Sequence, residues 1–275
     1  MLTATVLALI SAFLHAGWNF LVKTGEERDL VAWGQFTFGA LLALPVLVVV
    51  GLPGVEAVPY LAASASVHVV YVLALLRSYH HGDFSLAYPL ARGSGALLAA
   101  IGGVALLDDR LGGWSWAAIG IVILGVVLLV GPNIHGPTIG WALLTGATIG
   151  TYTLIDSAGA RRTEGLPYGL TLIACSALAI TLVNIGRGRA AAFRASLPGA
   201  WRRYGLGGAC TTAAYSLVLI AVRYAPVGYV ATLRESSVLI AALLGWLVLH
   251  ETLGRRRSIA SAVMAAGLAL LVATR

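Results

Sequence analysis

Two arginines, Arg92 and Arg234, stand inside stretches of sequence that are otherwise almost entirely apolar. An ionised side chain in hydrocarbon costs about 2.5 to 3.5 kcal/mol on insertion scales, so it requires a partner or a water-filled cavity. A guanidinium group suits carboxylates and phosphonates, because its N–H donors match their paired oxygens. Both arginines are therefore candidates to hold an anionic group. The alternative is a structural role, paired with Glu235, Asp156 or backbone carbonyls, and the sequence leaves both roles open.

Polar and aromatic residues recur at helical spacing in the neighbouring apolar stretches. Residues three or four apart share one face of a helix, so each series forms a stripe. Rings with a hydrogen-bonding tip suit the wall of a cavity for organic solutes. Besides the two arginines, the candidate substrate-binding residues are His15, Trp18, Asn19, His68, Tyr71, Tyr88, Tyr152 and Tyr215. Taken one at a time, the same residues also suit hydrogen-bonded interior, packing or interfacial positions.

Two carboxylates inside apolar stretches, Glu235 and Asp156, are candidates to carry a coupling proton. For Glu235 the adjacent Arg234 opposes protonation, because a nearby cation favours the charged carboxylate. Two further acids, Asp109 and Glu251, stand at the ends of apolar stretches. Such positions are close to water, so a capping or interfacial role is expected for both.

The sequence predicts no metal site and no cofactor. The two cysteines, Cys175 and Cys210, fall inside apolar stretches and have no His or Cys at metal-ligand spacing. No phosphate-binding Gly-Lys-Ser/Thr loop occurs, which makes a secondary carrier more economical than an ATP-driven pump. The motifs His-Glu-x-x-His and Gly-x-Ser-x-Gly are absent as well, so an enzyme is not expected.

The elements that must position these residues follow from the hydropathy pattern. Of the 275 residues, 59% are hydrophobic and only 11% are charged. The apolar residues form blocks close to the roughly twenty residues that a helix needs to cross a bilayer. The predicted spans are 4–22, 30–50, 58–76, 84–107, 114–130, 138–157, 167–185, 204–222, 227–249 and 258–273. This pattern predicts an all-α polytopic membrane protein with ten transmembrane helices, the first of them retained rather than cleaved.

The formal charge of +7 comes mainly from arginines between the spans, which indicates membrane orientation rather than nucleic-acid binding. The longest connection, 186–203, is basic and is expected to form an amphipathic surface segment. Eleven Lys and Arg residues fall on the side away from both termini and five on the side of the termini. The positive-inside rule then places both termini outside. The strong preference for Arg over Lys is typical of a GC-rich bacterial genome, so a bacterial plasma membrane is the expected location.

The chain contains an internal repeat. A shift of 142 residues superposes 92–130 on 234–272 without a gap, and fourteen of the thirty-nine positions are identical, the two arginines among them. Each half, 1–133 and 134–275, holds five predicted spans, an odd number, so the halves are expected to be inverted repeats within one membrane unit. Inverted repeats place a substrate site near the bilayer midplane and expose it to each side in turn. Fusion of the halves also makes a monomer the expected form.

Several short stretches carry a resemblance to a known family. They are GDF at 82–84 leading to YPLAR at 88–92, and YAPV at 224–227 leading to RES at 234–236. In these the chain resembles EamA-type members of the drug/metabolite transporter superfamily, over nearly its whole length. The stretch HAGWN at 15–19 also resembles members associated with phosphonate utilisation.

The resemblance implies a membrane transporter, often an exporter, of metabolites that include amino acids, sugars, nucleotide sugars and dicarboxylates. Together with the two arginines it predicts a secondary transporter of a small polar or amphipathic metabolite (an amino acid, organic acid or phosphonate-like anion) that works by alternating access. The alternative function is a flippase for a lipid-linked sugar or phosphate, as in related small members, and an intramembrane enzyme is a more remote alternative. Expected partners are the bilayer, a small-molecule substrate and, as an option, a coupling proton. The resemblance implies cytoplasmic termini, opposite to the count of basic residues, and the sequence leaves orientation open.

Overall fold

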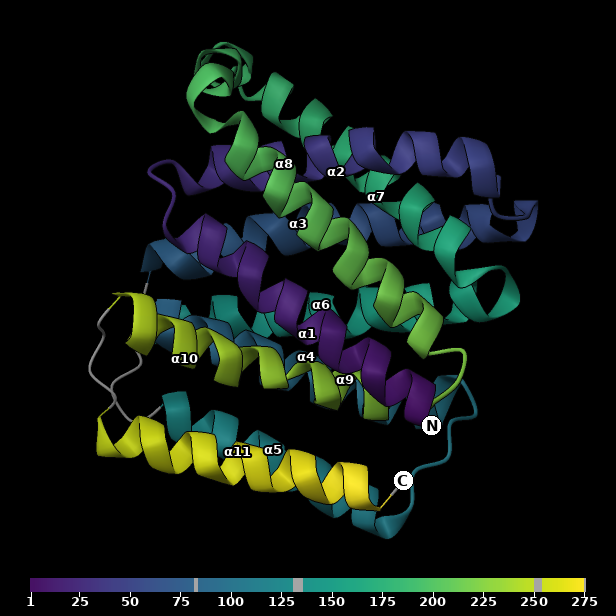
Figure 1. The fold of residues 1–275 in the computed structure, drawn as a ribbon, viewed down its shortest axis with the longest axis vertical. Helices are drawn as coiled ribbons and strands as arrows, with labels where there is room; N and C mark the ends of the chain where they lie inside the picture. Colours follow the sequence, from purple (N-terminus) through teal and green to yellow (C-terminus); the bar gives the residue numbers. More distant parts are fainter. Residues whose placement is uncertain (82–83, 131–135, 250–253, 275) are drawn as a thin grey trace.

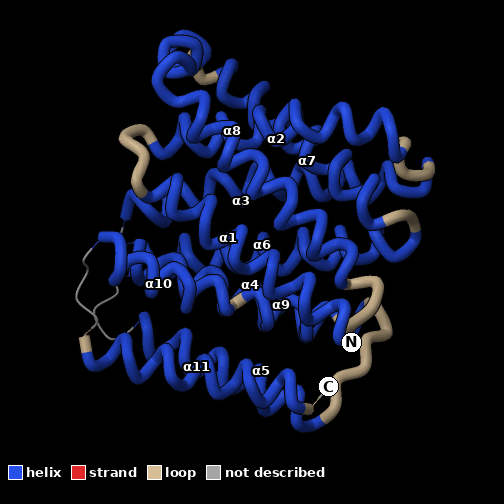
Figure 2. The backbone as a smooth tube through the Cα atoms, viewed as in Figure 1, coloured by secondary structure: helices blue, strands red, loops and turns tan. Residues whose placement is uncertain are grey.

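The computed structural model describes residues 1–81, 84–130, 136–249 and 254–274. Within them the chain forms helices joined by short turns (Figures 1 and 2). In chain order these are α1 (Leu2–Lys23), α2 (Arg28–Val50), the 3₁₀ helix η1 (Val55–Ala57), α3 (Val58–His81), α4 (Phe84–Leu106), α5 (Gly113–Val130), α6 (Gly136–Arg162), α7 (Gly165–Gly186), α8 (Ala190–Ala221), α9 (Val227–Arg234), α10 (Ser236–Leu249) and α11 (Arg255–Ala273).

Most of these helices have the length and composition of membrane spans. Nine helical segments of the described chain are long and apolar enough to cross a bilayer, with α9 and α10 counted as one, and α5 is a shorter apolar helix. Large apolar side chains point outward from them: Phe13 is 64%, Val48 86% and Leu182 60% exposed. Such a surface suits lipid, where apolar side chains need no cover. The predicted all-α polytopic membrane fold is confirmed.

Figure 1 shows both termini on one face of the helical layer, near the turn between α8 and α9. We call this side the terminus face. Helix α1 crosses from it to the opposite side, which carries the turns 24–27 and 187–189. We call that side the basic face, because most of the arginines between helices belong to it.

Helices of the two predicted halves pair in a pattern that is unchanged when the halves are exchanged. Helix α4 packs on α6 as α1 packs on α9 and α10, and α3 packs on α6 as α8 packs on α1. Helices α5 and α11 pack on each other (Figure 1). There a Cβ on Gly125 would clash with Met264, and one on Gly267 would clash with Val122. This reciprocity agrees with an inverted repeat, while the division into 1–133 and 134–275 stays a prediction.

The ninth predicted span, 227–249, is not one continuous helix. Helix α9 ends at Arg234 and α10 begins at Ser236, with Glu235 between them. The Glu235 N–H bonds to the Thr232 carbonyl, three residues back, at 3.0 Å, so the backbone tightens into a 3₁₀ turn. The predicted span is confirmed, since residues 227–248 are together long and apolar enough to cross a bilayer. The turn inside it was not predicted, because a side chain of α4 binds a backbone carbonyl there and apolar content cannot reveal that contact.

The predicted basic connection 186–203 is helical over most of its length. Helix α8 begins at Ala190 and continues into the membrane without interruption. Its first turns are held by Phe193, which stacks on Trp33 of α2 with ring centroids 4.2 Å apart. The helix therefore begins fourteen residues before the predicted eighth span, because packing on α2 orders residues that the sequence analysis assigned to a connection.

Several arginines at the basic face cap the carbonyl ends of helices. Arg203 donates to the Leu21 carbonyl near the end of α1 at 2.6 Å, and Arg256 donates to the Leu128 carbonyl of α5 at 2.7 Å. The last carbonyls of a helix have no partner within it, so a guanidinium group can satisfy them. These arginines thus have a structural role beside any role in orienting the chain.

Candidate functional site

A cavity of about 70 Å³ lies between α1, α2, α3, α6, α7 and α8. The exposed Arg28 lies at its mouth on the basic face, and the buried Arg234 of α9 lies at its inner end. Eight of the ten predicted substrate-binding residues line it: His15, Trp18, Asn19, His68, Tyr71, Tyr152, Tyr215 and Arg234. A buried water needs about 10 to 15 Å³. The cavity therefore has room for several water molecules.

The rest of the lining lies outside the predicted set. It consists of Val22, Arg28, Ala32, Gln35, Phe36, Val72, Leu75, Ile173, Thr211 and Ala214. Among its polar members, Thr211 lies on the same face of α8 as Tyr215, whereas Arg28 and Gln35 of α2 are the ones that sequence reasoning missed. Their spacing of seven residues, with Ala32 between, places them on one face of the helix. That spacing could have identified them in the sequence as residues that face the cavity.

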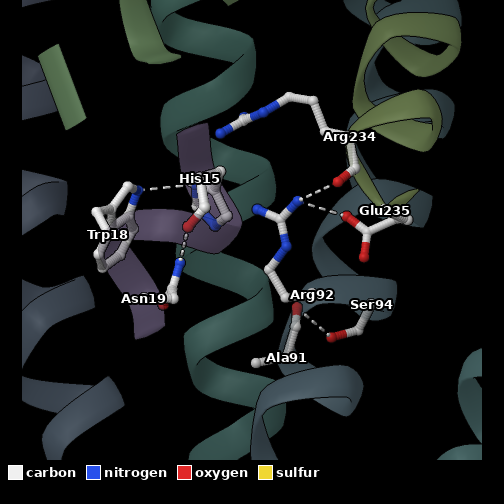
Figure 3. Close-up of polar contacts among 8 residues, drawn as sticks. All are labelled: His15, Trp18, Asn19, Ala91, Arg92, Ser94, Arg234 and Glu235. Carbon is white, nitrogen blue, oxygen red and sulfur yellow. Dashed lines mark hydrogen bonds and ion pairs between the residues drawn. The ribbon is translucent and has the colours of Figure 1, made fainter. Parts of the chain in front are cut away.

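Arg92, Tyr88 and Glu235 are not part of the cavity lining. The Arg92 Nη2 atom lies 2.8 Å from Glu235 Oε1 and donates to the Arg234 carbonyl at 3.3 Å (Figure 3). Arg92 is 4% and Glu235 1% exposed, so the pair is buried. This is one of the structural arrangements that the sequence left open. It fastens α4 to the break between α9 and α10.

Arg234 has a different environment from its repeat counterpart. Its guanidinium carbon lies 5.9 Å from the centroid of the Tyr215 ring, within the range of a cation–π contact. Within the described part of the chain it forms no ion pair. Its side chain lines the cavity, whereas that of Arg92 does not. Arg234 therefore offers an uncompensated positive charge to a solute in the cavity.

Four aromatic side chains form one wall of the cavity. His68 stacks on Tyr152 with centroids 4.2 Å apart, and Tyr71 and Tyr215 meet the Tyr152 ring edge-on at 5.5 and 6.1 Å. The His68 Nδ1 atom lies 2.9 Å from the Ser64 carbonyl, so it carries the ring's proton. This wall is apolar across its ring faces and polar at its tips.

His15 contributes a hydrogen-bond donor near the two arginines. The Trp18 Nε1–H group, which can only donate, bonds to His15 Nδ1 at 3.2 Å. Nδ1 therefore has no proton, and the neutral ring carries its proton on Nε2. Asn19 donates to the His15 carbonyl at 2.7 Å. Figure 3 shows the ring directed toward the guanidinium groups of Arg92 and Arg234.

Asp156 of α6 lies outside the cavity lining, behind Tyr215. The hydroxyl of Tyr168 donates to its Oδ1 at 3.0 Å, and the hydroxyl of Tyr215 donates to its Oδ2. The residue is 0% exposed, and no described cation pairs with it. The cavity wall thus connects, through one tyrosine, to a buried carboxylate whose oxygens are both hydrogen-bonded.

An ion pair joins the helices at the terminus face, opposite the cavity mouth. Asp109 Oδ1 lies 2.8 Å from Arg161 Nη2, and Asp109 Oδ2 accepts the Val227 N–H at 2.6 Å. Because Val227 is the first residue of α9, Asp109 has the capping role expected for it. Arg161 also donates to the Val222 carbonyl at 2.8 Å. Glu251, the other boundary acid, lies outside the described residues.

Removing the Arg161 guanidinium is expected to loosen the terminus face. The test uses Ser157→Cys, at a buried position, in a chain whose Cys175 and Cys210 are replaced by Ala. Opening of the terminus face exposes this cysteine, so a membrane-impermeant maleimide then labels it faster. A partly exposed ion pair with Asp109 contributes about 1 kcal/mol, which corresponds to about fivefold in an opening equilibrium. Arg161→Gln should therefore raise the labelling rate about fivefold.

The matched control is Arg162→Gln. The Arg162 guanidinium lies over the Tyr60 ring at 5.1 Å, and it forms no ion pair among the described residues. This variant should label at the rate of the parent. Equal rates for the two variants would show that the ion pair does not hold the terminus face closed.

Comparisons with known proteins agree with this architecture. Residues 136–273 match the model of the EamA-like transporter family. A solved chain described as "Crystal structure of protein" superposes with a TM-score of 0.79 over 99% of both chains at 16% identity, which shows a shared fold. Among curated protein sequences no match is found. The chain belongs to the EamA-like transporter family of the drug/metabolite transporter superfamily and is a multi-pass membrane transporter of small molecules.

Proposed function

We propose that the protein is a secondary transporter of a small organic anion: an amino acid, an organic acid or a phosphonate-like compound. The observation that carries the proposal is Arg234, a buried guanidinium without an ion pair among the described residues, at the inner end of a cavity open to one face. A buried unpaired charge is costly. A carboxylate or phosphonate in the cavity would supply the missing negative charge.

The other lining residues suit the rest of such a solute. The Nε2–H group of His15 is directed to the same region as Arg234 and can donate to a second oxygen of the anion (Figure 3). The stacked rings of His68 and Tyr152 present apolar faces for a carbon skeleton. Trp18 and Gln35 add polar groups closer to the mouth. Together they favour a small amphipathic anion over a neutral sugar.

Alternating access requires the two faces to open in turn. In the conformation described, the cavity opens at the basic face while the Asp109–Arg161 ion pair joins helices at the terminus face. Transport would break this pair as α1, α2 and α3 close the mouth. The break at Glu235 lies next to Arg234, so the substrate-binding cation stands on an element that can bend.

We also propose that the protein works as a monomer in a bacterial plasma membrane. The Arg-rich composition supports a bacterial plasma membrane, and the two halves within one chain support a monomer. Export is the expected direction by resemblance to the family.

Counterflow in liposomes tests the proposal. Purified protein is reconstituted in vesicles loaded with unlabelled solute, and uptake of the same radiolabelled solute from outside is measured. The panel consists of L-lactate, L-glutamate, succinate and methylphosphonate, with D-glucose as a neutral comparison. We expect exchange of at least one anion and none of glucose. Exchange of glucose alone, or of no solute, would contradict anion transport.

A further inference from the structure

Four ionisable side chains determine the net charge in the membrane interior of the described chain. Arg92 and Arg234 are cations, and Glu235 and Asp156 are carboxylates, each at most 4% exposed. His15 counts as neutral, because its Nδ1 accepts a hydrogen bond. His68 also counts as neutral, because it is buried and no described carboxylate pairs with it. With both carboxylates ionised the sum is zero, and with one of them protonated it is +1.

The two carboxylates differ in their partners. Glu235 lies 2.8 Å from the Arg92 guanidinium, so a proton on it would leave that cation uncompensated. Asp156 has hydroxyl partners only: Tyr168 of α7 and Tyr215 of α8. Of the two, Asp156 is the carboxylate that can take up a proton without breaking an ion pair.

The other titratable groups near Asp156 are held in contacts of their own. Tyr152, on the same helix, stacks on His68 of α3. The buried cations of the neighbouring helices are Arg92 of α4, which pairs with a carboxylate, and Arg234 of α9, which lies over the Tyr215 ring. Of the less buried cations, Arg77 of α3 lies over the Trp141 ring, and Arg161 of α6 itself pairs with Asp109. Asp156 and Arg234 thus contact opposite parts of one tyrosine side chain, its hydroxyl and its ring.

Building on the proposed function, we infer that Asp156 binds the coupling proton and that one proton moves in the same direction with each negative charge of the substrate. Protonation of Asp156 leaves the membrane interior at +1, and an anion at Arg234 returns it to zero. A low-dielectric interior favours the neutral total, so each of the two ligands strengthens binding of the other.

The proton follows a closed cycle. It comes from water on the side to which the cavity is open and forms an O–H bond on the Asp156 carboxylate. The Tyr215 hydroxyl then loses an ionised acceptor, and its ring, against which Arg234 lies, is free to shift. After the opposite face opens, the O–H bond breaks and the proton leaves with the anion. The cycle moves no net charge.

Electroneutral movement is tested by driving uptake with two different gradients. Each anion that exchanges in the counterflow panel is offered at equal concentration inside and outside vesicles. A monoanion should accumulate about tenfold with an outside pH one unit lower than the inside pH. A membrane potential set with potassium and valinomycin should have no effect on it.

In Asp156→Asn the membrane potential should replace the pH gradient as the driving force for anion accumulation. The amide mimics the protonated acid, so the interior stays at +1 and the anion crosses without a proton. Counterflow should persist, the pH gradient should no longer drive accumulation, and an inside-positive potential of about 59 mV should drive it about tenfold. Glu56→Gln, which neutralises an exposed acid, should behave as the parent.

Tyr168→Phe provides a second test that keeps the carboxylate. Tyr168 does not line the cavity, and its hydroxyl bonds to the ionised Asp156. Its loss favours the protonated acid, so the pH of half-maximal uptake should rise by about one unit.

The outcomes separate this inference from the proposed function. Wild-type protein that exchanges an anion but ignores the pH gradient would overturn the role of Asp156 and leave anion transport standing. So would an Asp156→Asn variant that still accumulates solute with the pH gradient, or an unchanged pH midpoint in Tyr168→Phe. Absence of counterflow in the wild type would contradict anion transport itself.

Discussion

Replacing Arg234 by Gln is expected to reduce anion counterflow about a hundredfold without loss of folded protein. Truncating one partner of a desolvated, hydrogen-bonded charge pair costs about 2 to 5 kcal/mol. The fold should survive, because Arg234 forms no ion pair among the described residues, so its loss breaks no ion pair there. Initial rates of counterflow at low solute concentration, with elution on size exclusion as the check of folding, measure both effects.

Two variants serve as controls for this result. Arg28→Gln removes an exposed cation at the mouth of the same cavity and should lower the rate less than about threefold, since solvent screens that charge. Arg234→Lys keeps the charge but loses the paired donors, so an intermediate rate is expected. If Arg234→Gln exchanged anions at the parental rate, the cavity cation would have no part in recognition.

Arg92→Gln is expected to act on stability instead, lowering the free energy of unfolding by about 3 to 5 kcal/mol. The substitution leaves Glu235 buried without its cation, and it also removes the donor to the Arg234 carbonyl at the helix break. Thermal unfolding in detergent, followed by tryptophan fluorescence, measures the change. Because the two arginines are equivalent in the repeat, the contrast with Arg234→Gln is direct.

The double variant Arg92→Gln, Glu235→Gln shows whether the ion pair accounts for the loss. It contains no unpaired charge at this position, so it should recover most of the stability that Arg92→Gln loses. The contact to the Arg234 carbonyl stays missing, and recovery should therefore be incomplete. Additive losses from the two substitutions would rule out an energetic coupling between Arg92 and Glu235.

The transmembrane architecture was predictable because it depends on properties that are local in the chain. A span is recognised from roughly twenty consecutive apolar residues, whatever packs on it later. The stripes that include His15, His68, Tyr152 and Tyr215 were predictable for the same reason, since helical spacing alone places them on one face. The break at Glu235 and the early start of α8 were not predictable, because contacts from α4 and α2 hold those backbones.

By itself the sequence determined the number and order of the spans, the internal repeat and most of the residues that face the cavity. It could not assign different roles to Arg92 and Arg234, which occupy equivalent positions in the repeat. In the tertiary structure Glu235 pairs with Arg92 and not with Arg234, and this difference separates the roles of the two arginines. Neighbours in a helix point in different directions, so the carboxylate next to Arg234 in sequence turns away from it and pairs with Arg92 of another helix. Only Gly93 stands at the corresponding place in the first repeat, and Arg234 is left to face the cavity.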